Sequence, residues 1–263
     1  MGLLHFRVMV AAPDFSSSVR PSHAEIAANI AAVRARIDAA ATRVGRDPTS
    51  VGLIAVSKTV PVERLRDMEI EGLAALGENK VQEGAAKVEA LGRPTEWHLV
   101  GHLQTNKAKA AVGLFDLIHS VDGVALAAAL DKHAGTSGLR QRVLLQVNVA
   151  GEESKSGFSP DEVRTAAHRL ASFKALRIEG LMTIAPQGAD ESALRGVFSA
   201  LRALREELEP AFREDHWRHL SMGMTDDFTI AVEEGATLVR VGRAIFGARP
   251  SPGDVEPSTE KAR

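Results

Sequence analysis

Short apolar runs alternate with helical segments along nearly the whole chain, and this alternation constrains the fold more than any other feature. Residues 51–57, Val-Gly-Leu-Ile-Ala-Val-Ser, form a continuous apolar run that is typical of a strand buried on both faces. Seven further strands are predicted at 73–77, 97–101, 117–121, 142–149, 177–183, 217–221 and 237–241. Strict alternation with helices predicts a parallel sheet, and eight such units favour a single closed (β/α)₈ TIM barrel of the α/β class.

The predicted helices begin and end at recognisable signals. Ser22 and Glu25 match a capping box at the start of the first helix, which should end at Gly45. Pro61 is expected to open the next helix and Gly72 to close it. The remaining helices are predicted at 79–91, 105–112, 123–134, 160–172, 190–209 and 226–234, with caps at Asn79 and Ser159.

Composition limits the classes of protein to consider. The length of 263 residues suits one barrel domain at 22–248, with disordered segments expected at 1–21 and 249–263. The absence of cysteine excludes disulfides and thiolate metal sites. The net charge of -2, with no basic run, argues against nucleic-acid binding. No apolar run is long enough to span a membrane, and no signal peptide is evident, so we expect a cytoplasmic protein.

Lys58 is the first candidate functional residue. It follows directly after the first predicted strand, and functional residues of a barrel lie at the carboxyl ends of the strands. An ammonium at the mouth of an apolar strand loses hydration, which favours the neutral amine that a Schiff base requires. By position alone, a lysine that simply reaches solvent is the alternative interpretation.

Two further motifs follow the seventh and eighth strands. Ser221-Met-Gly-Met-Thr-Asp-Asp227 combines a hydroxyl, a glycine that permits close backbone approach and a helix start, which together favour a phosphate. In Leu238-Val-Arg-Val-Gly-Arg243, Arg240 lies inside an apolar strand, where a buried guanidinium implies an acceptor. Barrels frequently bind phosphate with these two loops, and closure should bring them beside Lys58.

Several motifs, in order along the chain, are shared with a known family. They are Ala-Val-Ser-Lys58, Leu-Gly-Glu-Asn79, Glu-Trp-His98-Leu-Val-Gly-His-Leu-Gln104-Thr-Asn-Lys107, Ser154-Lys-Ser-Gly157, Gly180-Leu-Met-Thr183, Leu220-Ser-Met-Gly-Met-Thr-Asp-Asp227 and Val239-Arg-Val-Gly-Arg-Ala-Ile-Phe-Gly247. With these motifs the chain resembles the pyridoxal phosphate homeostasis protein family. The resemblance implies a barrel similar to the N-terminal domain of alanine racemase (PLP fold-type III). It also implies a mostly monomeric protein that binds pyridoxal 5′-phosphate (PLP), has little or no turnover and keeps the free cofactor in balance, with apo PLP-dependent enzymes as recipients.

The resemblance also implies roles for individual residues. The family's Schiff-base lysine falls on Lys58, and its arginine that faces the pyridine nitrogen falls on Arg240. The family's phosphate contacts fall on Ser221, Gly223, Gly242 and the amide of Arg243, and Asn79 matches a residue near the cofactor. Arg243 departs from the family, whose members often carry Thr there, so a hydroxyl contact is lost.

Two alternatives to a PLP carrier remain open. A PLP-dependent racemase of the alanine racemase type would pair the lysine with a tyrosine base from a second domain, whereas this chain contains no tyrosine. An aldolase-like barrel would place its lysine deep in a middle strand rather than after the first. A metal site at His98 and His102 is not expected, because no carboxylate joins them at ligand spacing. His119 and His219 are predicted to be core or rim histidines.

Overall fold

The computed structural model describes residues 21–66, 68, 70, 72–152, 155–212 and 217–248. The segments predicted to be disordered, 1–21 and 249–263, lie outside the described residues except for Pro21.

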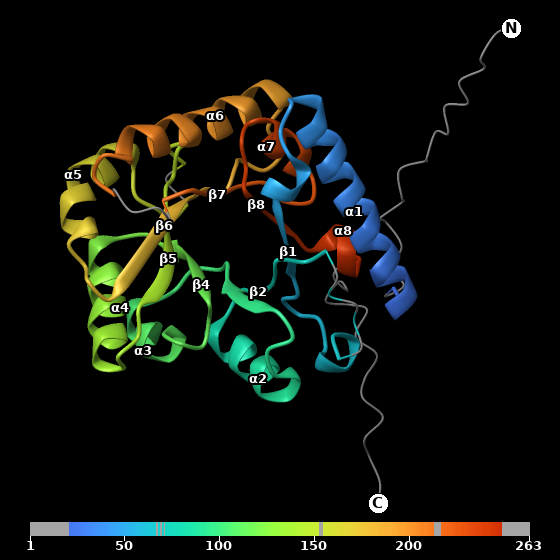
Figure 1. Ribbon diagram of the computed structural model, residues 1–263, viewed down its shortest axis with the longest axis horizontal. Helices are drawn as coiled ribbons and strands as arrows, with labels where there is room; N and C mark the ends of the chain where they lie inside the picture. The colour runs from blue at the N-terminus through green and yellow to red at the C-terminus, as the bar shows by residue number, and fades with distance from the viewer. Residues whose placement is uncertain are drawn as a thin grey trace, which may run out of the picture.

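Eight parallel strands form a closed barrel in sequence order, which confirms the predicted fold (Figure 1). The strands are β1 (Gly52–Val56), β2 (Ala75–Glu78), β3 (Glu96–Leu99), β4 (Leu117–Val121), β5 (Gln141–Gln146), β6 (Leu176–Met182), β7 (His219–Ser221) and β8 (Leu238–Val241). The barrel closes where β1 pairs with β8, with Gly52 opposite Leu238 and Ile54 opposite Arg240. The first and last units of the chain are therefore neighbours.

Helices surround the strands as an outer ring (Figure 1). They are α1 (His23–Arg43), α2 (Val81–Leu91), α3 (Ala108–Ala111), α4 (Val124–Thr136), α5 (Pro160–Ala171), α6 (Glu191–Leu208), α7 (Phe228–Glu233) and α8 (Arg243–Phe246). The capping boxes predicted at Ser22 and Ser159 are both present. In the described part of the chain, none of these helices combines the length and apolarity that crossing a membrane would take.

Two predicted helix starts are wrong. The segment opened by Pro61 forms only a short 3₁₀ turn, Val62–Arg64, in place of a helix to Gly72. Of its described residues, only Leu65 and Met68 are buried, which is too little tertiary packing to stabilise a helix of three turns. Helix α2 begins two residues later than expected, with Lys80 rather than Asn79 at the N-cap and no side-chain cap.

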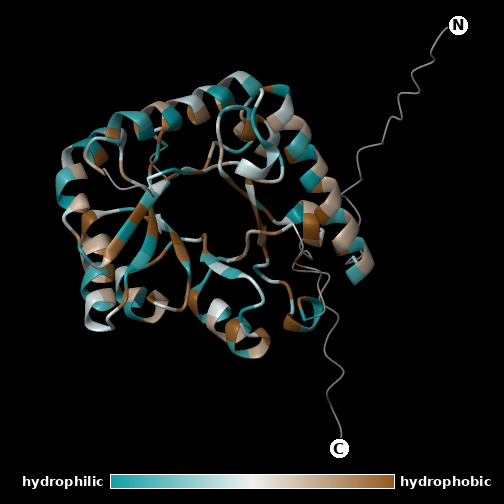
Figure 2. Ribbon diagram, viewed as in Figure 1, coloured by the Kyte–Doolittle hydropathy of each residue, from teal (hydrophilic) through white to brown (hydrophobic). Residues whose placement is uncertain are grey.

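The apolar core has two parts. The larger part lies between the strands and the helices and includes the fully buried Trp97 and Phe198. The smaller part consists of Ile54, Ala75, Leu117, Leu144, Met182 and Leu238. The ring helices are mixed brown and teal along their length, as expected of helices with one apolar face (Figure 2). The small apolar cluster leaves room for polar side chains on the same strands.

Gly180 in β6 allows β7 to approach closely, and we expect Gly180→Ala to destabilise the barrel. Its φ is +146°, and an added Cβ would lie 2.0 Å from the carbonyl oxygen of His219. Strain and overpacking of this kind should lower the free energy of unfolding by about 3 kcal/mol or more. Gly45→Ala is the control, since Gly45 has a φ of +70° but no atom within 4 Å of the added Cβ. It should cost only about 1 kcal/mol. Equal losses for the two variants in urea unfolding would contradict this account.

Candidate functional site

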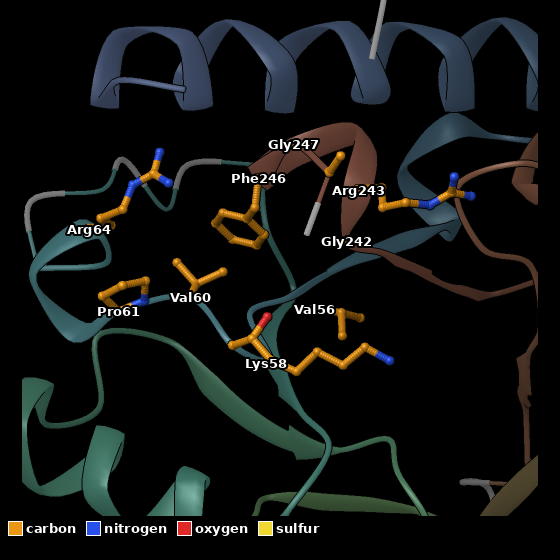
Figure 3. Close-up of a pocket in the computed structure, with 11 residues that line it drawn as sticks. Val56, Lys58, Val60, Pro61, Arg64, Gly242, Arg243, Phe246 and Gly247 are labelled. Carbon is orange, nitrogen blue, oxygen red and sulfur yellow. The ribbon is translucent and has the colours of Figure 1, made fainter. Parts of the chain in front are cut away.

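Lys58 lies two residues beyond the end of β1, at the mouth of the barrel. Its side chain is partly buried and lines a pocket together with Gly242 and Arg243 from the β8 loop. Figure 3 shows the side chain extended beneath Val56, with the ammonium pointing away from Pro61 and Arg64. Closure through β1 and β8 thus places Lys58 beside the β8 loop, as the sequence predicted.

The backbone on both sides of Lys58 is held by side chains of α2. Lys87 Nζ donates to the carbonyl oxygen of Ser57 at 2.7 Å, and Glu83 Oε1 accepts from the amide of Thr59 at 2.6 Å. Thr59 has a φ of +66°, a conformation that a residue other than glycine adopts only when its surroundings enforce it. These contacts therefore fix the direction in which the Lys58 side chain leaves the strand.

A buried ion pair between Lys87 and Glu78 holds the α2 side chain that contacts the backbone next to Lys58. Lys87 Nζ lies 2.6 Å from Glu78 Oε1 and 2.8 Å from Glu83 Oε1, and Glu78 also accepts from the Ser57 hydroxyl at 2.5 Å. Burial raises the pKa of Glu78, against the opposing hydrogen bonds from Lys87 and Ser57. Sequence reasoning missed this cluster. The available signals were the Glu83–Lys87 spacing of four on one helix and a glutamate at the end of an apolar strand.

Arg240 on β8 is a buried cation whose hydrogen-bond partners are neutral. Its NH1 donates to Ser221 Oγ at 2.6 Å and its NH2 to the carbonyl oxygen of Thr183 at 2.9 Å. Among the described residues no carboxylate forms an ion pair with Arg240, although the buried carboxylate of Asp227 acts on it electrostatically and raises the pKa of the guanidinium against the effect of burial. Burial lowers the pKa of the guanidinium to about 10, so it remains charged at neutral pH. A buried cation whose hydrogen bonds go to neutral groups rather than to a carboxylate favours the arrival of an electron-rich ligand group.

The loops after β7 and β8 lie against each other and against β1. The amide of Arg240 donates to the carbonyl oxygen of Gly223 at 3.0 Å. Gly223 has a φ of +93°, and a Cβ there would lie 2.6 Å from the Ala231 Cβ. A Cβ on Gly242 would lie 3.2 Å from the carbonyl oxygen of Val56. Both glycines thus permit close backbone approach at the mouth where Lys58 lies.

Arg243 and Asn79 occupy different surroundings. The Arg243 side chain is exposed and forms an ion pair with Asp226 of the β7 loop, so its charge already has a partner. Asn79 is half-buried and packs against the β3 loop, where a Cβ on Gly101 would lie 2.5 Å from Asn79 Oδ1. Because Asn79 does not cap α2, the capping role no longer accounts for it.

The histidines divide between the mouth and the barrel interior. His102 pairs with Asp122 at 3.0 Å and is exposed, whereas His98 is buried and contacts His119 at 3.0 Å. His119 is fully buried, which confirms the prediction of a core histidine. His98 and His102 therefore belong to separate interactions, and no group of potential metal ligands was found among the described residues.

Comparisons with known proteins agree with this geometry. Residues 28–250 match the family model described as alanine racemase, N-terminal domain. The chain is 43% identical to the pyridoxal phosphate homeostasis protein of Aquifex aeolicus, over 81% of this chain and 94% of the relative. The PipY protein of Synechococcus elongatus, solved with PLP bound, is 39% identical with a TM-score of 0.75, over 84% of this chain and 100% of PipY. Alanine racemase from Corynebacterium glutamicum, 19% identical with a TM-score of 0.67, shares the fold over 88% of this chain and 63% of its own.

Breaking the buried ion pair at Lys87 should destabilise the protein, because the variant Lys87→Met leaves Glu78 as an unpaired buried carboxylate. We expect a loss of about 3–5 kcal/mol in the free energy of unfolding, measured by urea denaturation. The double variant Lys87→Met/Glu78→Gln should recover part of that loss, because the uncompensated charge is removed. Lys80→Met, at the exposed residue that precedes the same helix, should change stability by no more than about 0.5 kcal/mol. A double variant less stable than the single one would refute the assignment.

Proposed function

Since the chain belongs to the pyridoxal phosphate homeostasis protein family, within the wider family of alanine racemase N-terminal domains, we propose that it binds PLP through a Schiff base on Lys58. The relatives' name and the PLP-bound PipY support this cofactor. The observation that carries the proposal is Arg240, a buried guanidinium whose hydrogen bonds go to neutral oxygens. It lies on β8, which pairs with β1, the strand that precedes Lys58.

The residues at the mouth fit such a cofactor in their chemistry. The Lys58 amine is the proposed covalent attachment point, and the Arg240 guanidinium is the proposed partner of the pyridine nitrogen. The proposed phosphate contacts come from Gly223, Gly242 and the amide of Arg243. Glycine is required at the first two positions because a Cβ there would meet Ala231 and the carbonyl oxygen of Val56, respectively. Asn79 is proposed to lie near the cofactor. When bound, PLP supplies an aldehyde that reacts with amines and a ring that accepts electrons.

Two features of the chain favour binding over turnover. The sequence contains no tyrosine, so it cannot supply the tyrosine base that a racemase of the alanine racemase type pairs with its lysine. Arg240 remains a cation at neutral pH, and a cation opposite the pyridine nitrogen discourages protonation of that nitrogen. An unprotonated ring withdraws electrons weakly. We therefore propose a PLP-binding protein of intracellular PLP homeostasis, and keep a weakly active PLP-dependent racemase as the alternative.

Addition of PLP to the purified protein should produce a visible absorbance band that borohydride removes, leaving PLP fixed on Lys58. Peptide mapping by mass spectrometry should locate the reduced adduct on Lys58, because only the Schiff base is converted to a stable amine. Lys58→Ala should lose the adduct at that peptide.

Lys80→Ala is the matched control for this experiment, because Lys80 also lies two residues beyond the end of its strand but is exposed. It should form the band and the Lys58 adduct as the wild type does. A colourless wild-type protein, or an adduct on another lysine of the wild type, would overturn the proposal.

The proposed role extends to a cytoplasmic monomer that passes PLP to apo forms of PLP-dependent enzymes. The word homeostasis in the relatives' name supports this extension. The PLP-loaded protein should reactivate an apo-aminotransferase faster in one solution than across a membrane that passes only small molecules. Equal rates would show that recipients capture only released PLP, and would rule out direct transfer. Light scattering measures whether the protein is a monomer.

A further inference from the structure

A chain of hydrogen bonds crosses the barrel interior from Arg240 to the opposite rim. Arg240 NH1 donates to Ser221 Oγ at 2.6 Å, and Ser221 Oγ lies 2.8 Å from His119 Nδ1. His119 Nε2 lies 3.0 Å from His98 Nδ1, and His98 Nε2 lies 2.9 Å from Glu96 Oε2. We call these five residues the interior relay. Its members come from β8, β7, β4 and β3, and all except Glu96 are buried.

The donor and acceptor of every hydrogen bond in the interior relay follow from the chemistry of its two end residues, Glu96 and Arg240. The hydrogen bond from His98 is the main reason why the pKa of Glu96 is lowered to about 2, so at neutral pH Glu96 is a carboxylate that only accepts. His98 Nε2 must then carry a proton. Burial lowers the pKa of both His98 and His119, which keeps both rings neutral with one proton each.

The protons can then be placed one by one. Because His98 is protonated at Nε2, its Nδ1 accepts, and His119 Nε2 is the donor. Because His119 is protonated at Nε2, its Nδ1 accepts from the Ser221 hydroxyl. The single hydroxyl proton of Ser221 is thus directed at His119, and its oxygen is left to accept from Arg240. The Arg240 guanidinium can only donate, so every hydrogen bond of the interior relay is donated in the direction from Arg240 towards Glu96.

We propose that His119 and His98 are positioning residues for Arg240, which they hold by fixing the Ser221 hydroxyl as an acceptor for the guanidinium. This inference rests on the proposed PLP-binding function, in which Arg240 contacts the cofactor. It also changes the role of Ser221. A hydroxyl whose only proton is directed at His119 has none to donate to a phosphate, so Ser221 acts through Arg240 rather than as a phosphate donor.

Glu96 gives the inference its most informative variant. It lies at the start of β3, at the rim opposite the mouth, and its side chain is 44% exposed. Its second partner, Arg142, keeps an ion pair with Glu179, so Glu96→Gln should fold. A glutamine either donates or accepts, so His98 and His119 are no longer restricted to one tautomer.

Asp116→Asn is the matched control, because Asp116 is a carboxylate just before β4 that acts on His98 only through space. Its own contacts are the ion pair with Arg93 and a hydrogen bond from the Trp97 amide.

The first measurement is ¹⁵N NMR of the imidazoles in the cofactor-free protein at neutral pH, assigned from single His→Asn variants. His98 and His119 should both show a protonated Nε2 and an unprotonated Nδ1. Glu96→Gln should disturb this pattern, and Asp116→Asn should leave it intact. A protonated Nδ1 on His119 in the wild type would overturn the inference.

The second measurement is the affinity for PLP and the position of its visible absorbance band. Glu96→Gln should bind PLP about threefold to tenfold more weakly and shift the band, although it lies at the far rim, whereas Asp116→Asn should match the wild type. Unchanged binding in Glu96→Gln would refute the positioning role. Borohydride trapping on Lys58 of the wild type separates the two claims, because absence of that adduct would overturn the proposed function itself.

Discussion

The hydrogen bonds between β1 and β8 close the sheet, and the whole candidate site depends on that closure. The lysine comes from the first strand and the arginine from the last, 182 positions apart in the sequence, yet Ile54 and Arg240 are paired across the seam. An open sheet with the same strands would place these two edges at opposite sides of the molecule. Parallel pairing all around the barrel further ensures that every strand ends at the same mouth, so loops that are distant in sequence meet there.

Inside the closed sheet, apolar and polar side chains share a small volume. Six apolar residues form the inner cluster around Ile54 and Leu117, while the interior relay provides buried nitrogen and oxygen atoms with partners. Burying such groups unpaired would cost about 1–3 kcal/mol each, which explains why the chain of contacts continues until it reaches solvent at Glu96. Arg240 is the exception, since its guanidinium donates to neutral acceptors and, among the described residues, forms no ion pair with the nearby Asp227 carboxylate. The buried polar groups of the interior relay are thus held by hydrogen bonds, while the Arg240 guanidinium can still accept an electron-rich ligand group as a partner.

The order of strands and helices was predictable because each strand is a short apolar run, and because three of the described helices, α1, α5 and α6, start at a side-chain cap. Closure, and with it the position of Lys58 beside the β8 loop, followed from counting the units. The segment after Pro61 was predicted wrongly, because a local start signal does not reveal how little of the segment is buried. The pair Lys87–Glu78 and the contact between His119 and Ser221, 102 positions apart, were not predictable. Charged residues are exposed by default, and no local pattern records which of them meet across the fold.

The contacts of Lys87 have a consequence for chemical selectivity. Two lysines flank the end of β1, and an aldehyde would react with the neutral amine of either one in free solution. Lys87 is almost fully buried, and its Nζ donates hydrogen bonds to three oxygen atoms, those of Ser57, Glu78 and Glu83, so its nitrogen is not accessible to an aldehyde. Lys58, two residues beyond the end of β1, lines a pocket at the mouth of the barrel. The fold thus buries one amine among three acceptors and places the other at a pocket, and the buried amine holds the backbone next to Lys58.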